Sequence, residues 1–179
     1  MPASPSVAAA GVGSEQRVIV GVGDLAVSNN QSLSLTTYSL GSCIGVTIYD
    51  PVVRVGGLLH FMLPDSTINP AKAIEQPAVF VDTGIPAFFR AAYQLKAEKQ
   101  RVIICAAGGA QMMDGGDFFN IGARNYTSLT ALMTKHGLDI QAEQVGGMVS
   151  RTMTLNLRTG EVRLKVSGRL EEQVLFKGL

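Results

Sequence analysis

One cysteine and one histidine in neighbouring segments are the residues of this sequence best suited to catalysis. The chain contains two cysteines and two histidines. Cys43 follows Gly41 and Ser42 in "SLGSCIGVTIYD", and His60 lies in "GGLLHFMLP". An imidazole beside a thiol favours the thiolate, which is the nucleophilic form of cysteine. This pairing is typical of cytosolic Cys-His hydrolases and transferases.

The segments that carry Cys43 and His60 predict the two strands of an antiparallel hairpin. Apolar residues alternate with small or polar ones through residues 43–50. Asp50-Pro51 predicts the turn, because proline fixes φ and aspartate can bond nearby backbone amides. With a four-residue loop that starts at Asp50, Cys43 is expected directly opposite His60, with Cβ atoms about 4.5–5.5 Å apart. A register slip would move the histidine to a diagonal position.

Other features of this window favour catalysis. Gly41 and Ser42 permit close backbone approach, so the N–H groups of Ser42 and Cys43 can point at a developing oxyanion. The run "SLSLTTYS" supplies hydroxyls that can hold the histidine in one orientation. A plainer hypothesis is also open, in which Cys43 and His60 merely pack in the half-buried sheet of a non-catalytic adaptor domain.

The other cysteine and histidine fit structural roles. Cys105 lies among β-branched residues in "RVIICAAGG", where a thiol packs as a small apolar group. His136 is in the last turn of a predicted helix, where a cation interacts favourably with the helix dipole. Because no C-x-x-C or H-E-x-x-H spacing occurs, a metal site is the weaker alternative. The pair Gly21-x-Gly23 lacks the third glycine of a dinucleotide-binding loop.

Composition and charge restrict the classes of partner. Fifteen basic residues balance fourteen acidic ones, with no basic run, which gives no electrostatic case for nucleic acid or an anionic membrane. The uncharged residues 25–49 are rich in Ser, Thr, Asn and Gln, so no membrane insertion is expected. The N-terminus lacks the basic region of a secretory signal. We expect a cytoplasmic protein with a flexible arm over residues 1–15 and a single domain over residues 16–179.

The pattern of strands and helices predicts an α+β protein. The expected strands are the hairpin, a short buried strand in "RVIVGVG", a core strand in "RVIICAAGG", and a second hairpin over residues 152–166 with one wet face. Two helices are expected between them, one in "VDTGIPAFFRAAYQLKAEK" with Asp82 or Thr83 as its cap and one in "NIGARNYTSLTALMTKHG" ending at Gly137. Strands at both ends favour a sandwich over a doubly wound parallel sheet.

At these same residues the chain resembles the CheD family of chemoreceptor glutamine deamidases. The resemblance covers residues 18–166 and rests on "TYSLGSCIGVTIYDPVVRVGGLLHFMLPDS", "GGAQMM", "IGARN", "VGG" and "TGEVRLK". It implies a layered α/β/β sandwich, in agreement with an α+β fold of mostly antiparallel strands and two main helices. It also implies that the family's nucleophilic cysteine is Cys43, its histidine is His60 and its threonine is Thr37.

The resemblance implies a reaction and partners. The reaction is hydrolysis of glutamine side-chain amides on chemoreceptor cytoplasmic helices, through a cysteine thioester and without a metal or organic cofactor. A CheC-type phosphatase is an implied partner, so a non-catalytic regulatory binding module is the alternative. A γ-glutamyl amidase or a transglutaminase would share the chemistry. The chain departs from the family pattern at Ser150 and at Cys105-Ala106-Ala107, where we expect partner or substrate surfaces to differ.

Overall fold

Two packed β-sheets and a layer of helices form the part of the chain that the computed structural model describes, residues 15–112 and 120–179. The strands are β1 (Gln16–Ile19), β2 (Asp24–Ser28), β3 (Leu33–Leu40), β4 (Ile44–Asp50), β5 (Val55–Phe61), β6 (Ile103–Gly108), β7 (Ala142–Val145), β8 (Arg151–Asn156), β9 (Val162–Val166) and β10 (Glu172–Phe176). The α-helices are α1 (Pro70–Glu75), α2 (Val81–Gln94) and α3 (Ile121–Lys135), and two short 3-10 helices are η1 (Ser66–Ile68) and η2 (Pro77–Val79).

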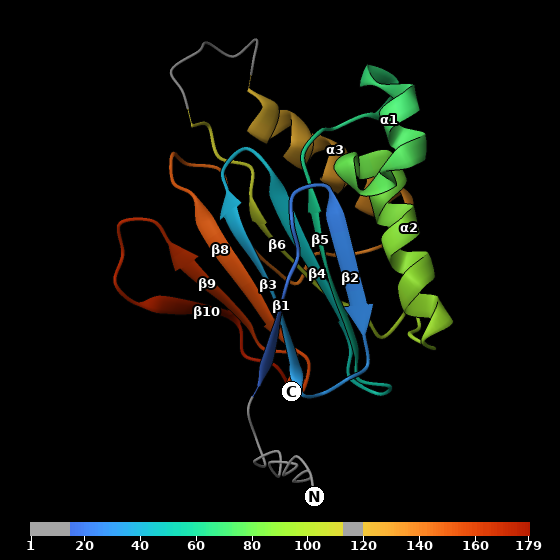
Figure 1. The fold of residues 1–179 in the computed structure, drawn as a ribbon, viewed down its shortest axis with the longest axis vertical. Coiled ribbons are helices and arrows are strands. Elements are labelled where there is room, and N and C mark those ends of the chain that lie inside the picture. Colours follow the sequence, from blue (N-terminus) through green and yellow to red (C-terminus); the bar gives the residue numbers. More distant parts are fainter. Residues whose placement is uncertain (1–14, 113–119) are drawn as a thin grey trace, which may run out of the picture.

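The strands are arranged as an α/β/β sandwich (Figure 1). One sheet has the order β1-β3-β8-β9-β10, and the other has the order β2-β5-β4-β6-β7. All pairs are antiparallel except β1 with β3 and β6 with β7. The helices cover the outer face of the second sheet (Figure 1). The predicted α+β sandwich with two main helices is therefore confirmed.

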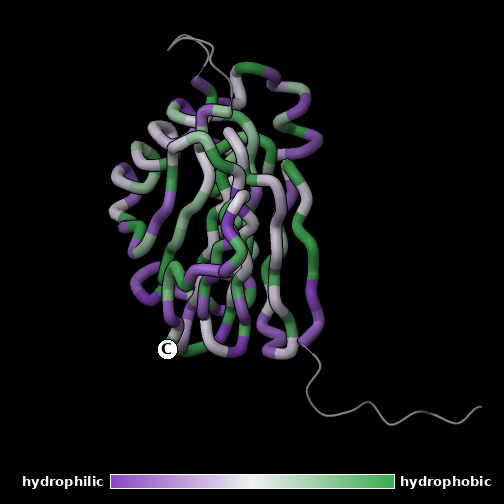
Figure 2. Tube along the Cα trace, turned by 90° about the vertical axis from the view of Figure 1, so that its left-hand side faces the viewer, coloured by the Kyte–Doolittle hydropathy of each residue, from purple (hydrophilic) through white to green (hydrophobic). Residues whose placement is uncertain are grey.

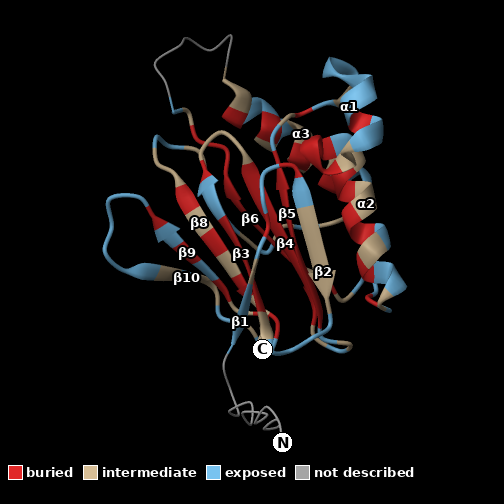
Figure 3. Ribbon diagram, viewed as in Figure 1, coloured by how far each residue is buried: buried red, intermediate tan, exposed pale blue. Residues whose placement is uncertain are grey.

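The second sheet is buried on both faces, which gives the molecule two apolar layers. Because side chains alternate along a strand, Ile44, Val46 and Ile48 of β4 pack under the helices, while Tyr49 packs between the two sheets. In Figure 3, β4, β5 and β6 are buried along their length. Hydrophobic segments follow the strands in Figure 2, and hydrophilic ones gather in the connections. Cys43 contacts the layer between the sheets.

The hairpin of β4 and β5 is confirmed, but its expected register is wrong. Asp50 pairs with Val55, so the loop consists of residues 51–54 and starts one residue later than expected. The Asp50 side chain accepts a hydrogen bond from Val52 N at 2.9 Å, as predicted for the turn. His60 consequently pairs with Gly45, two residues beyond Cys43. Since the side-chain period is two, Cys43 and His60 still share the face between the sheets, as diagonal neighbours.

Helices α2 and α3 are confirmed, whereas the expected cap of α2 is wrong. Phe80 occupies the N-cap of α2 and makes no side-chain capping bond. Asp82 instead accepts hydrogen bonds from the backbone and hydroxyl of Ser66, and Thr83 donates to Pro77 O at 2.7 Å. These bonds fasten the preceding turns to the helix.

The end of α3 follows the sequence prediction. Gly137 has a φ of 59°, the left-handed conformation that a glycine adopts without strain after a helix. His136 immediately precedes it as the C-cap residue. At the other end, the Asn120 side chain accepts a hydrogen bond from Ala123 N and caps the helix.

The sequence predicted one further hairpin correctly and one strand wrongly. The hairpin of β8 and β9 is confirmed, with Met153, Leu155, Val162 and Leu164 buried against the other sheet. The buried strand expected in "RVIVGVG" is wrong, because β1 is an exposed strand at the edge of its sheet. The N-terminal arm predicted for residues 1–15 lies, apart from its last residue, outside the described residues. Among the described residues, no helix is both long and apolar enough to cross a membrane.

Candidate active site

Thr37 and His60 meet between the two sheets, and Cys43 contacts the same apolar layer from the turn before β4. Thr37 is contributed by β3 of the first sheet and His60 by β5 of the second. Cys43 lies in the connection from β3 to β4, which crosses from one sheet to the other. Thr37 and His60 have no exposed surface, and Cys43 is half-buried. Access from solvent is therefore on the side of the cysteine.

The hydrogen bonds of Thr37 assign the tautomer of His60. The Thr37 hydroxyl lies 2.6 Å from Val20 O, which can only accept, so the single hydroxyl proton is donated there. The same oxygen lies 2.7 Å from His60 Nδ1 and must accept a hydrogen bond from it. Nδ1 therefore carries the ring proton, and Nε2 carries a lone pair. Nε2 is buried and has no hydrogen-bond partner among the described residues.

The electrostatics favour a neutral pair in the free protein. Burial lowers the pKa of His60 to about 4, because a protonated imidazole would lose its hydration there. Burial also raises the pKa of the Cys43 thiol, and the hydrogen bond from its own backbone N–H offsets only part of that effect. Burial thus favours a thiol and a neutral base on one face of the hairpin in the free protein, whereas the pairing of cysteine with histidine in the sequence led us to expect a thiolate.

Hydrogen bonds to the carbonyl groups of the turn that carries Cys43 hold this turn in place. Gly41 O accepts a hydrogen bond from Ala110 N at 2.8 Å, and Cys43 O accepts one from Gly109 N at 2.9 Å. By contrast, the N–H groups of Ser42 and Cys43 donate to no backbone carbonyl of the described residues. Amides beside a thiol can bind an anionic oxygen when they have no partner in the protein, so the oxyanion site expected at Ser42 and Cys43 stays a prediction.

A glycine is required where β6 approaches this turn. Gly108 has a φ of 116°, and a Cβ atom built on it would lie 2.2 Å from Cys43 O. No other residue fits without displacing the Cys43 carbonyl. Strand β3 contributes a second irregularity, a shift in its pairing with β8 between Thr37 and Leu40, within which Ser39 has a φ of 58°. Such bulges redirect a strand, and here the bulge separates Thr37 from the cysteine turn.

Asn125 is a site residue that the sequence reasoning missed. It lies in α3, has no exposed surface, and donates from Nδ2 to Ser42 O and to Met62 O, both at 2.9 Å. It thereby joins the turn before β4 to the residue that follows β5. The signal was present in the sequence, because Asn125 falls on the apolar stripe of the helix, four residues before Leu129 and eight before Met133. A polar residue at such a position must find partners in the core.

Cys105 has the structural role that the sequence predicts. Its exposed fraction is 1%, and burial raises the pKa of its thiol to about 11, so it is not a nucleophile near neutral pH. Ala106 and Ala107 are equally buried in β6, so the family departure at residues 105–107 concerns the core and not the expected partner surface. Among the described residues, no three His, Cys, Asp or Glu side chains are grouped so as to hold a metal ion.

The chain is similar to a family of known proteins over most of its length. A family model described as "CheD chemotactic sensory transduction" matches residues 62–166. A protein of Syntrophus aciditrophicus, named "Probable chemoreceptor glutamine deamidase CheD 1", is 48% identical over 151 residues, which are 84% of this chain and 94% of that protein.

Two further relatives carry the name "Probable chemoreceptor glutamine deamidase CheD". The protein of Solibacter usitatus is 46% identical over 159 residues, 89% of this chain and 94% of its own length. The protein of Pyrococcus abyssi is 38% identical over 163 residues, 89% of this chain and 98% of its own length. On this similarity the chain belongs to the CheD family.

Proposed function

We propose that this protein is a protein-glutamine deamidase that converts glutamine side chains of methyl-accepting chemoreceptors to glutamate in chemotaxis. The relatives that share 37–48% of their residues with this chain are named as chemoreceptor glutamine deamidases. The observation that carries the proposal for this chain is the free, unprotonated Nε2 of His60 on the same hairpin face as Cys43. A neutral general base close to a thiol is the arrangement that acyl transfer requires.

The first half of the proposed reaction forms a thioester. The Cys43 proton passes to His60 Nε2 while Sγ bonds to the carboxamide carbon, so the buried pair does not form a separated ion pair beforehand. The resulting oxyanion is bound by the N–H groups of Ser42 and Cys43. His60 then gives its proton to the nitrogen, the C–N bond breaks, and ammonia leaves. Nε2 has no hydrogen-bond partner in the part of the chain that the structure describes, and such contacts commonly tighten only when substrate binds.

The second half of the reaction consumes water. His60 Nε2 takes a proton from a water molecule, whose oxygen attacks the thioester carbon. The carbon–sulfur bond then breaks, and the proton returns to the sulfur. The products are a glutamate side chain, ammonia and the free enzyme. Throughout, the hydroxyl of Thr37 keeps the ring proton on Nδ1 and is an orienting residue for the imidazole.

The setting that we propose follows from this reaction. The protein would act in the cytoplasm, where the signalling helices of chemoreceptors lie, as a single domain over residues 16–179. Replacing an amide by a carboxylate adds one negative charge to a helix surface and can shift a signalling equilibrium. A CheC-type phosphatase is a further proposed partner, for which the support is membership of the family.

The proposal is tested by the intact mass of a chemoreceptor cytoplasmic fragment incubated with the protein. Each deamidation exchanges NH₂ for OH and adds about one mass unit, which we expect with the wild-type chain and with Cys105→Ala. We expect no gain with Cys43→Ala. A mass gain at an equal rate with Cys43→Ala would refute the assignment of Cys43 as the nucleophile. No mass gain with the wild type or with either variant would favour the non-catalytic binding module.

A further inference from the structure

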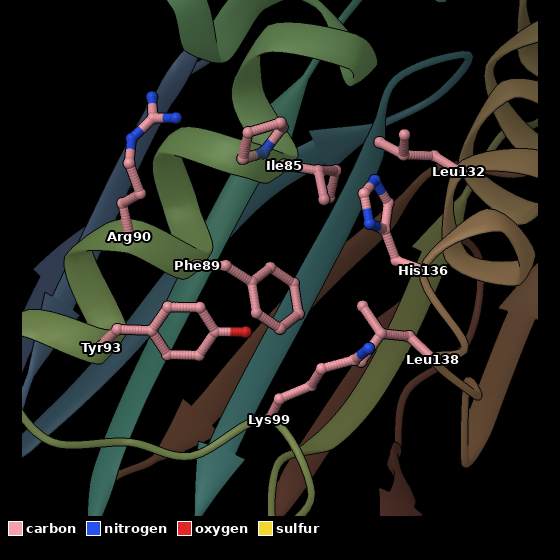
Figure 4. Close-up of a pocket in the computed structure, with 9 residues that line it drawn as sticks. Ile85, Phe89, Arg90, Tyr93, Lys99, Leu132, His136 and Leu138 are labelled. Carbon is pink, nitrogen blue, oxygen red and sulfur yellow. The ribbon is translucent and has the colours of Figure 1, made fainter.

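A hollow of about 210 Å³ lies between α2 and α3 on the outer, helical face of the molecule (Figure 4). Its floor is apolar. Ile85 and Phe89 of α2 face Leu132 of α3 and Leu138 of the segment that follows α3. Among these, Ile85 and Phe89 are buried in the core, so they are held rigidly beneath the opening.

The size of the hollow restricts what it can hold. An apolar cavity of about 150 Å³ accepts a benzene ring, whereas pockets for drug-sized ligands and cofactors occupy about 300–1,000 Å³. At about 210 Å³ the hollow between α2 and α3 fits one aromatic ring or one branched aliphatic side chain. A single anchoring side chain in a well-packed pocket is also how protein partners gain most of their binding energy.

The rim of the hollow is basic. Arg90, Lys99 and His136 line it together with the half-exposed Tyr93, and no acidic side chain does so. Within residues 15–112 and 120–179, none of the three basic side chains takes part in an ion pair. Figure 4 shows Lys99 extending toward Leu138, the His136 ring beside Leu132, and Arg90 at the outer edge on α2. Such a rim attracts carboxylates at short range.

We propose that this hollow is an anchor site for an acidic segment of a partner protein. The segment would insert one phenylalanine or leucine side chain between α2 and α3 and place flanking carboxylates over Lys99, His136 and Arg90. The concave shape and the volume of a single side chain fit a peptide anchor better than a flat lipid surface. The apolar floor has no hydrogen-bond donor for the phosphates of a nucleic acid.

The anchor site is separate from the candidate active site. Helices α2 and α3 pack on one face of the second sheet, together with Ile44 and Val46 of β4. Cys43 contacts the apolar layer on the opposite face, between the sheets. The proposal therefore does not depend on the chemistry of Cys43, and a change at the rim should leave hydrolysis of a small glutamine amide unaltered.

The test is a titration of the full chain with short peptides, followed by two-dimensional NMR of the backbone amides. The probe is a blocked pentapeptide with phenylalanine at its centre and two glutamates on each side. We expect saturable shifts confined to residues 85–93 and 132–138. Replacing the central phenylalanine by alanine should weaken binding by at least about tenfold, because the apolar area of the ring would no longer be buried.

A charge-reversed variant provides the second arm. Arg90→Glu combined with Lys99→Glu changes exposed side chains only, and its unshifted spectrum elsewhere would report an intact fold. We expect it to bind the acidic peptide at least fivefold more weakly and to bind a lysine-flanked peptide more tightly than the wild type does. The inference is overturned by equal binding of the alanine peptide, by unchanged affinity in the charge-reversed variant, or by an absence of shifts at millimolar peptide. Phenylacetate binding as tightly as the peptide would also overturn it, in favour of a small-molecule acid.

Discussion

At the scale of single residues, the proposed catalysis depends on the position of one proton. The Thr37 hydroxyl has a single hydrogen and gives it to Val20 O, so the ring proton of His60 must lie on Nδ1 to complete the second hydrogen bond. The sequence predicted that a nearby hydroxyl would orient the histidine, but not that burial would keep both partners neutral. Burial of His60 depends on the second sheet and the strands facing it, which no local pattern encodes.

The protonation states predict a broad pH profile for kcat/KM. His60 must be neutral to act as a base, and its pKa of about 4 places the acid limb near pH 4. The thiol must keep the proton that ammonia finally receives. The alkaline limb should therefore lie above the ordinary titration range of a cysteine, because burial raises the pKa of Cys43. The measurement is deamidation rate against pH at low substrate, with folding checked by circular dichroism. An acid limb near 6.5, the ordinary histidine value, would contradict the assignment.

Substitution of Thr37 tests the orienting hydrogen bond. Thr37→Val keeps the shape of the side chain but leaves Nδ1–H unpaired, so the ring proton can move to Nε2. We expect kcat to fall by roughly 10–100-fold, with a smaller change in KM. Thr37→Ser restores the hydroxyl and should recover most of the rate. Equal rates for the valine and serine variants would show that Thr37 only fills space.

At the scale of elements, the limits of sequence reasoning have identifiable causes. The hairpin of β4 and β5 was predictable from alternation and from the turn at Asp50, but its register depended on where the loop begins, and Asp50 stays in the ladder. Strand β3 was missed because its buried positions carry hydroxyls, such as Thr36, which bonds to Thr154 Oγ1 at 3.0 Å across the sheet. Polar side chains that pair with one another do not produce an apolar pattern.

Helix α3 supports the site through Asn125, which gives a prediction at this scale. Asn125→Ala removes the bonds to Ser42 O and Met62 O and leaves these two carbonyls with fewer partners. We expect the free energy of unfolding to fall by about 2–3 kcal/mol, and kcat to fall while KM changes little, because the amides of the cysteine turn lose their fixed position.

Asn120→Ala in the same helix is the matched control for this substitution. Asn120 caps the start of α3, and the hydrogen bonds of its side chain to other described residues involve Gln111 and Ala123, not Ser42 or Met62. Its loss should cost about 1 kcal/mol of stability without changing kcat. If Asn125→Ala also retained the wild-type kcat at a temperature where it is folded, Asn125 would stabilise the fold without positioning the turn that carries Cys43.

At the scale of the whole molecule, one buried carboxylate ties the hairpin to the segment after α2. Burial alone would raise the pKa of Asp50, but hydrogen bonds from Arg101 and from the backbone N–H groups of Glu98, Val52 and Val53 lower it below its ordinary value. A carboxylate with a lowered folded pKa stabilises the fold above its unfolded pKa, near 3.9, and this contribution is lost as the pH falls through the folded value.

We therefore expect Asp50→Asn to lower the free energy of unfolding by about 2–4 kcal/mol at pH 7 and by less below pH 4. Denaturant unfolding at both pH values measures the difference. Glu98→Gln removes an exposed carboxylate that pairs with Arg101, the same arginine that binds Asp50. This substitution should lower the free energy of unfolding by less than about 1 kcal/mol. A difference for Asp50→Asn that is as large at pH 3 as at pH 7 would contradict the ionised assignment.

The most direct test of the central claim is to trap the acyl-enzyme. The protein is mixed with a glutamine peptide from a chemoreceptor helix, quenched in acid within the first turnover, digested, and analysed by mass spectrometry. The account predicts an adduct on Cys43 equal to the peptide minus ammonia, its loss on longer incubation as glutamate peptide appears, and no adduct on Cys105. Glutamate formation that proceeds in Cys43→Ala, or an adduct found on any other side chain, would contradict it.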